Sequence, residues 1–489
     1  MVKIQKTSKL AKLSIAALLI GNSIVAAQHT GHAPVAAPVA EPTPAPVAEP
    51  APAPVAEPVV TAPAPVAVAE PAPVAKPVES LSTTIAGTKI SLYGRLELNS
   101  AYEDGITNGL WSAYAPKNSN KDAQGRTTLS VARSRFGFNL EGPSKEDEPT
   151  LKGRFEADFA AVGSGSSDFG NFRGSSGFRI RQSWGSVNFK DIGLTLLFGQ
   201  TDDVVNPIDP PSINPSSLNG AGNIGTRRPQ IRATQVVGPI DIAVAVMHDR
   251  IYNYTARMDK DKADPDRPAS TDADGNEIPA HKGTDKPVSE GSNPPSIPAF
   301  QGRVGLKLPA TWAGEKANLA FGVGGLYGKN EAANADAKNS YDSPEPAYML
   351  GLDLSLPLID ILTLTGEFFS GQNLSRYEGS FSSYSRAYSD DGGIKSTGWW
   401  GGLSAKLPAS VSAGAGIGAE NLDKKSKIAG NIESNMFIFG NVAYNFTSAA
   451  KVTFEYLNLA TNYTDKDGDT DKDKGHLNRF ELNFRYDFK

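Results

Sequence analysis

The sequence predicts an all-β protein, a transmembrane antiparallel β-barrel of about 16 strands, preceded by a disordered segment rich in proline and alanine. Three observations predict this fold class. Apolar and polar side chains alternate along most of the chain after residue 86, and short connections alternate with long polar ones. No uninterrupted apolar run of about 18 residues follows residue 27, so we expect no membrane-spanning helix.

The N-terminal region divides into two segments that precede the barrel. Four lysines come before the apolar stretch 13–20, and small residues follow at 25–27, so residues 1–27 are predicted to be a secretory signal peptide. Residues 28–85 repeat alanine, proline, valine and glutamate, which favours an extended linker in the periplasm. The linker is either a tether to peptidoglycan or another envelope partner, or a passive spacer. Residues 86–489 form the predicted barrel domain.

Sixteen segments carry the strand pattern, and each is expected to form one strand. They are 90–103, 127–140, 151–159, 178–189, 194–200, 230–237, 240–250, 300–308, 317–328, 348–356, 361–370, 398–407, 411–420, 436–446, 452–462 and 476–488. In the last of them Phe480, Leu482 and Phe484 share one face, whereas Arg479 and Glu481 lie on the other. Because an exposed cation in lipid costs about 2–4 kcal/mol at the bilayer centre, we expect the charged face to point inward.

The connections between these segments indicate the orientation of the barrel. Those at 190–193, 237–239, 357–360, 408–410 and 447–450 are short, and they alternate with long polar loops. Outer-membrane barrels have short turns on the periplasmic side and long loops outside. The sequence therefore predicts the bacterial outer membrane, with both chain ends and the linker in the periplasm.

Composition excludes several other classes of protein. The formal charge of −5 becomes −9 once the four lysines of the signal peptide are removed, so no nucleic-acid partner is expected. With no cysteine, disulfides and thiolate metal sites are excluded. The acidic loop 463–475 lacks the glycine and terminal acid of a helix-loop-helix calcium site, and no serine lies in a nucleophile-elbow context, so no metal, cofactor or enzymatic activity is expected.

A barrel of sixteen strands leaves a water-filled lumen, and arginines are concentrated on its inward positions. Arginine always carries its charge and binds carboxylates and phosphates in a bidentate manner. Besides Arg95, the predicted pore-lining and substrate-guiding residues are Arg133, Arg135, Arg154, Arg179, Arg181, Arg228 and Arg232. The predicted opposing acidic wall is Glu97, Glu156, Asp158, Asp202 and Asp203. Two interpretations remain open, since these arginines either select anions or pair with the acids to stabilise the wall.

The connection 201–228 is the predicted constriction. Its prolines and glycines prevent it from continuing a strand, and we expect it to fold into the lumen and narrow it. The alternative is a surface loop. Together with the arginines, a constriction predicts passive diffusion of small hydrophilic solutes with a preference for anions. The competing functional hypothesis is a structural anchor or adhesin tethered through the linker.

Four motifs resemble the DcaP-like outer-membrane porins. They are residues 134–138 (SRFGF), 179–185 (RIRQSWG), 199–201 (GQT) and 228–232 (RPQIR). The resemblance covers mainly residues 90–250 and implies a homotrimer of sixteen-stranded barrels that passes small anions, dicarboxylates among them. It assigns substrate guidance to Arg135, Arg179, Arg181, Arg228 and Arg232.

The chain departs from that family pattern at both ends. A proline-rich linker stands where the family often has a coiled-coil-like extension, and Lys489 follows the terminal aromatic Phe488. The first departure weakens the expectation of a trimer stalk, and the second changes the usual assembly signal. The expected surroundings are outer-membrane lipid and lipopolysaccharide.

Overall fold

A computed structural model describes residues 81–105, 113–116, 125–143, 145, 148–161, 177–248, 270–271, 277–278, 297–328, 346–377, 379, 394–423, 432–463 and 474–489. The predicted signal peptide, the linker up to residue 80 and most of the acidic loops 251–298 and 463–475 lie outside these residues. Among the described residues, no helix is long and apolar enough to cross a membrane.

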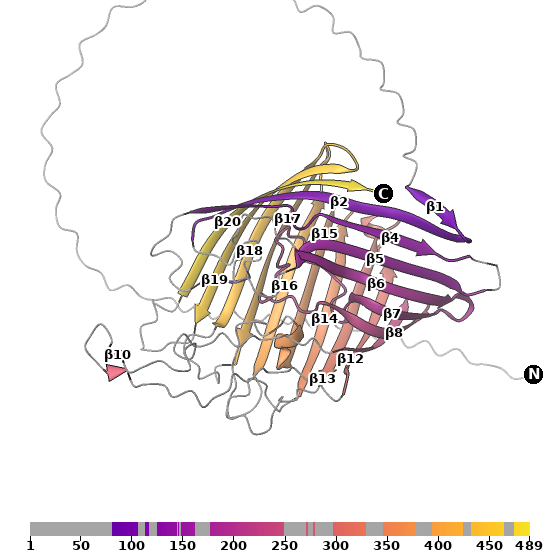
Figure 1. Ribbon diagram of the computed structural model, residues 1–489, viewed down its shortest axis with the longest axis horizontal. Helices are drawn as coiled ribbons and strands as arrows, with labels where there is room; N and C mark the ends of the chain where they lie inside the picture. Colours follow the sequence, from indigo (N-terminus) through magenta and orange to yellow (C-terminus); the bar gives the residue numbers. More distant parts are fainter. Residues whose placement is uncertain are drawn as a thin grey trace, which may run out of the picture. The chain divides into compact units, whose positions relative to one another are not determined.

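The described chain folds into a closed antiparallel barrel (Figure 1). Its strands are β2 (Thr88–Glu103), β3 (Arg126–Ser130), β4 (Arg135–Glu141), β5 (Thr150–Ala161), β6 (Gly177–Phe189), β7 (Leu194–Asp202), β8 (Arg227–Val237), β9 (Ile240–Met247), β12 (Ala299–Pro309), β13 (Asn318–Gly328), β14 (Ala347–Ile359), β15 (Leu362–Gln372), β16 (Lys395–Lys406), β17 (Val411–Leu422), β18 (Ile432–Asn445), β19 (Ala450–Tyr463) and β20 (Lys474–Phe488). A separate hairpin joins β10 (Ser270–Thr271) to β11 (Glu277–Ile278).

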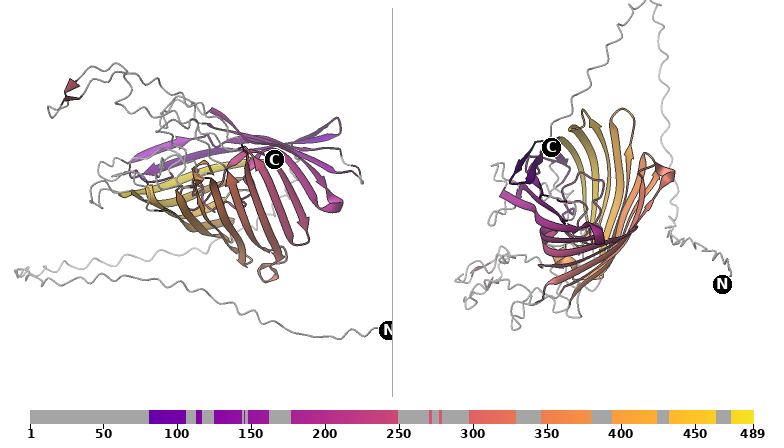
Figure 2. Two further views of the ribbon diagram at one scale, coloured as in Figure 1. Left: turned by 90° about the horizontal axis from the view of Figure 1, so that it is seen from below. Right: turned by 90° about the vertical axis from the view of Figure 1, so that its right-hand side faces the viewer.

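Each strand pairs with its neighbours in the chain, and the pairing of β2 with β20 closes the ring. In Figure 2 the strands curve from the first half of the chain to the yellow C-terminal strands, and β2 lies beside β20. Strands β3 and β4 share one place beside β2. The barrel therefore has the predicted 16 strand positions.

The predicted strand 127–140 is interrupted in the structure. Residues 131–134 leave the ladder, and the amide of Ser134 donates to the carbonyl of Val131 at 2.9 Å. The Ser134 hydroxyl accepts from the amide of Glu97 at 3.0 Å. This interruption was not predicted, because the residue pattern through it still alternates.

An extra strand, β1 (Ser82–Ile85), lies within the range predicted as linker. It pairs with β2 over residues 88–91, whereas β20 pairs with β2 only from Gly94 onwards. β1 thus occupies part of the β2 edge that lies beyond the end of β20. A covered edge cannot pair with another chain.

The outward face of the barrel is apolar, as the alternation predicts. Large hydrophobic side chains on almost every strand are exposed, as at Leu98, while the neighbouring Asn99 is fully buried and points inward. The five predicted short turns are also present, including a 3-10 turn, η2 (Lys190–Ile192), between β6 and β7.

The inward face is less polar than the alternation predicts. Two apolar clusters lie on it, and both include residues from the connection between β7 and β8. The first includes Ala245, Met247, Met349 and Phe369, and the second includes Trp400, Phe437, Phe439, Leu457 and Leu459. Strands that are buried on both faces become apolar on both faces. Part of the lumen is consequently packed rather than open.

Candidate functional site: the lumen cavity

The connection of residues 203–226, here called the lumen loop, lies inside the barrel. Its tip is hydrogen-bonded to inward side chains of distant strands. The carbonyl of Pro211 accepts from Asn441 at 2.8 Å, and that of Ile213 accepts from Arg133 at 2.6 Å. The prediction that this segment folds inward is confirmed.

The root of the lumen loop is held by a buried ion pair. Arg228 at the start of β8 lies 2.9 Å from Asp203, with both side chains almost completely buried. The guanidinium also lies 4.5 Å from the ring centre of Tyr377, in the 3-10 turn η5 (Leu374–Tyr377). Burial, opposed by Arg228, raises the pKa of the Asp203 carboxyl. Arg228 is thus a structural residue of the loop.

The middle of the lumen loop packs on the apolar inward clusters. Leu218 and Ala221 are fully buried in the cluster that contains Trp400. Gly222 has a φ of 103°, and a Cβ at this position would clash with the backbone of Trp399. Only glycine allows the loop to approach the wall this closely.

A cavity of about 620 Å³ lies between the lumen loop and the barrel wall. Among the described residues, nine basic and four acidic side chains line it. The basic residues are Arg95, Arg133, Arg135, Arg179, Arg181, Arg227, Lys406, Lys451 and Arg485, and the acidic ones are Glu97, Asp158, Asp209 and Asp360.

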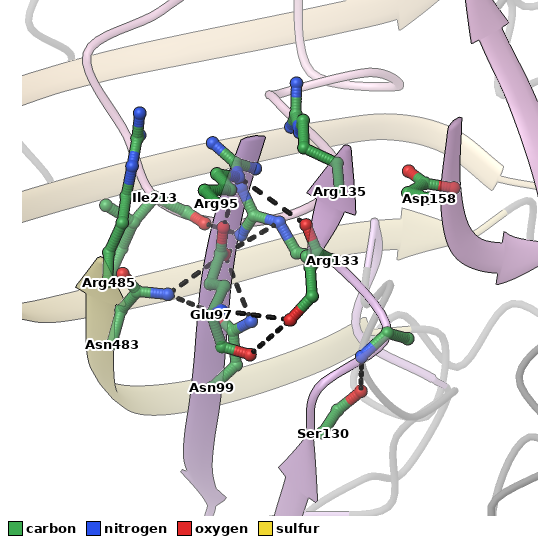
Figure 3. Close-up of polar contacts among 12 residues, drawn as sticks. Arg95, Glu97, Asn99, Ser130, Arg133, Arg135, Asp158, Ile213, Asn483 and Arg485 are labelled. Atoms are coloured by element: carbon green, nitrogen blue, oxygen red, sulfur yellow. Dashed lines mark hydrogen bonds and ion pairs between the residues drawn. The ribbon is translucent and has the colours of Figure 1, made fainter. Parts of the chain in front are cut away.

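One part of this lining is organised around Glu97 on β2 (Figure 3). The carboxylate lies 2.8 Å from Arg95 Nε and 3.1 Å from Arg133 Nε. It also accepts from the amides of Asn99 and Asn483, at 3.1 and 3.0 Å. Glu97 thus holds both arginines against the wall, and Arg133 also donates to the carbonyl of Ile213 in the lumen loop.

Arg95 and Arg135 face each other directly across β2 and β4. Like charges in this relation repel. Arg135 is anchored by Glu156 at 3.2 Å, while Arg95 is anchored by Glu97. Such a pair concentrates positive charge at one place on the wall.

A second part of the lining comes from β5 and β6. Arg179 binds Asp158 in a bidentate manner, at 2.9 and 2.6 Å. Arg181 bridges Glu156 and Asp158, at 2.7 and 3.1 Å. The ladder between β5 and β6 skips Arg181, so this arginine lies in a bulge. Bulges redirect side chains, and here both arginines of the 179–185 motif reach the same cavity.

The structure brings together only some of the predicted site residues. Arg133, Arg135, Arg179 and Arg181 line the cavity, with Glu97 and Asp158. Arg154 instead donates to Asn139 at 2.9 Å and stacks on Tyr93. Arg232 donates to Gln230 at 2.9 Å and to the backbone carbonyl of Asp202. These two arginines, like Arg228, lie outside the cavity lining.

The predicted acids do not form an opposing wall. Glu97, Glu156 and Asp158 lie on the same strands as the arginines and are paired with them. Asp203 is buried in the loop root, and Asp202 is exposed, 3.4 Å from Arg227. Opposite charges therefore lie side by side along the wall. The sequence alone did not indicate which inward side chains would face each other across the lumen.

Several lining residues were not predicted. Lys406, Lys451 and Arg485 extend the basic surface to the C-terminal strands, and Asp209 is an acid on the loop itself. The alternation of the last strand places Arg485 on the inward charged face, although it was not among the predicted pore-lining residues. Nothing in the sequence indicates that Asp209 faces arginines.

Comparisons with known proteins agree with this architecture. No family model matches the sequence, and no curated protein matches it. Among solved structures, the outer membrane channel DcaP of Acinetobacter baumannii is 16% identical, with a TM-score of 0.60 over 83% of this chain and 99% of that one. The chain has the fold of DcaP.

Two further solved structures align with lower scores. OmpT of Vibrio cholerae is 10% identical over 84% of this chain and all of that one, with a TM-score of 0.47. OmpF of Salmonella typhi is 9% identical over 83% of this chain and all of that one, also with a TM-score of 0.47. The predicted resemblance to DcaP-like porins is confirmed at the level of the fold.

Proposed function

We propose that the protein is an outer-membrane porin that allows passive diffusion of small hydrophilic solutes and favours anions such as small carboxylates and dicarboxylates. The observation that carries this proposal is the cavity inside the barrel, with nine basic and four acidic side chains in its lining. The selectivity of a pore follows from the charges that line it.

The wall chemistry supports anion passage without tight binding. Each guanidinium of the Arg179 and Arg181 pair already donates to a carboxylate of the wall, so a solute anion competes with these acids. Such competition keeps residence short, which conduction requires. The planar donors still favour a carboxylate over a neutral solute.

The surroundings of the barrel are part of the same proposal. The exposed apolar outer face fits the hydrocarbon of an outer membrane, with lipopolysaccharide at the long loops. The DcaP-like resemblance supports a homotrimer. The linker, in this orientation, lies in the periplasm.

Reversal potentials across a salt gradient in planar bilayers test the selectivity. Replacing both Arg179 and Arg181 with serine removes two lining cations, so we expect the reversal potential to move towards cation preference. Arg154→Ser is the matched control, because Arg154 lies outside the cavity lining. An unchanged potential in the double variant contradicts the proposed anion preference, and a folded wild-type barrel without current contradicts the channel itself.

A further inference from the structure

We propose that Glu455 on β19 is the positioning residue of the lumen loop, and that its carboxylate fixes the loop tip and thereby sets the width of the passage. The effect on passage width rests on the proposed channel function. The contact itself is independent of that function.

Glu455 is only 1% exposed, and its carboxylate receives four hydrogen bonds. Three come from the tip, from Ser212 Oγ at 2.8 Å, from the amide of Ile213 at 2.9 Å and from the amide of Asn214 at 3.1 Å. The fourth comes from Asn441 Nδ2 at 2.8 Å. The same nitrogen donates to Pro211 in the tip, so Glu455 also orients Asn441.

The partners of Glu455 differ from those of four other inward acids. Glu97, Glu156, Asp158 and Glu481 are each paired with arginine. Within the described part of the chain, Glu455 makes no ion pair, so loop N–H and O–H groups supply its stabilisation. Hydrogen bonds to an ionised acceptor are about twice as strong as neutral ones.

The position of Glu455 adds to this argument. It lies directly opposite Glu481 across β19 and β20, and two buried acids in this relation repel. Glu481 is compensated by Arg479 at 3.1 Å. The carboxylate of Glu455 is stabilised by the hydrogen bonds from the tip, and the tip is held in place by the same bonds.

The rest of the lumen loop is attached elsewhere. The root is held by Arg228 and Asp203, and the amide of Val204 donates to Gln301 at 2.8 Å. Asn435 donates to the carbonyl of Gly220 at 2.8 Å. Of the tip contacts, the bond from Arg133 to the carbonyl of Ile213 does not involve Glu455. Loss of the Glu455 contacts should therefore loosen residues 211–214 while the loop stays inside the barrel. Residues 210–213 line the cavity, so their release changes its width.

Hydrogen exchange, measured by mass spectrometry on the folded full-length protein in detergent, tests the contact without any transport assay. In Glu455→Gln one acceptor oxygen becomes a donor. Ile213 and Asn214 donate to different oxygens of Glu455, so in the variant one of these amides loses its acceptor and the other keeps only a neutral one. We expect the amide that loses its acceptor to exchange about tenfold faster or more, and the other to exchange faster by a smaller factor. Glu481→Gln is the matched control, because it changes a buried acid at the same level that does not bind the tip.

Single-channel recordings with polyethylene glycols of graded size test the consequence. We expect Glu455→Gln to admit larger polymers and to show greater current noise than the wild type and Glu481→Gln. If Glu455→Gln does not fold, Ser212→Ala removes one contact from the loop side and is expected to accelerate exchange at Asn214, which also donates to Ser212 Oγ.

Unchanged exchange in the tip of the folded variants, or equal acceleration in Glu481→Gln, overturns the positioning role. Accelerated exchange with an unchanged polymer cut-off overturns the link to passage width. A wild type without current contradicts the proposed channel and with it the passage-width role, but the exchange result still decides the contact.

Discussion

At the scale of single residues, Asp209 is the clearest exception in the basic cavity. It is an acid of the lumen loop that lines the cavity, and within the described chain its carboxylate makes no hydrogen bond or ion pair. It lies in the field of Arg227, Arg181 and Arg135. Its negative charge therefore opposes the anion preference that those arginines create.

Asp209 loses its charge at a higher pH than an ordinary aspartate does. Burial and then the nearby Asp202 raise the pKa of Asp209, so its charge is lost at a higher pH than the usual value of about 3.9. We expect anion preference to increase as the pH falls from neutral to mildly acidic. In Asp209→Asn the preference should be greater at neutral pH and less dependent on pH. Reversal potentials at several pH values measure both, and an identical pH profile in the variant contradicts this role.

At the scale of elements, the lumen loop is held at its root by the buried pair of Arg228 and Asp203. Arg228 was predicted to guide substrate, but it is buried against Asp203 and Tyr377. In the sequence Arg228 resembles the lining arginines, because both kinds lie on inward positions next to polar residues. What distinguishes it is its burial against Asp203 and under the ring of Tyr377, which is about 150 residues away in the chain.

Removal of Arg228 leaves the Asp203 carboxylate buried without this partner. We expect Arg228→Ala to lower the free energy of unfolding by about 3–5 kcal/mol. Addition of Asp203→Asn should recover part of this loss, because the uncompensated charge is gone. Urea unfolding in lipid vesicles, followed by tryptophan fluorescence, gives the double-mutant cycle. Additive losses in the cycle would show that the two side chains are not coupled.

The bulge in β6 is another feature at this scale that could not be predicted. Gln200 Nε2 donates to the carbonyl of Ile180 at 2.8 Å, next to Arg181, which the register between β5 and β6 skips. The apolar alternation of 178–189 gives no sign of the extra residue. The inward placement of Arg179 and Arg181 was predicted from the alternation, but their convergence on Asp158 depends on the bulge.

At the scale of the whole molecule, the barrel separates a lipid-facing surface from a charged interior. Leu352, near the middle of β14, points outward and is 41% exposed. We expect Leu352→Arg to lower the free energy of unfolding by about 2–4 kcal/mol in bilayers. Leu358→Arg, at the end of the same strand, should cost about 0–1 kcal/mol. Equal losses at the two positions in vesicle unfolding experiments would place the lipid boundary elsewhere.

The sequence by itself determined most of the strand positions, the closed barrel and its apolar outer face. These follow from local rules, since an alternation of period two and a short turn are properties of neighbouring residues. Tertiary structure decided which charges face the cavity, which are paired and buried at the loop root, and how Glu455 contacts residues 212–214. The Glu455 contacts join residues more than two hundred positions apart in the chain, and Arg228 meets Tyr377 about 150 positions away. No local pattern records which residues meet inside a closed ring.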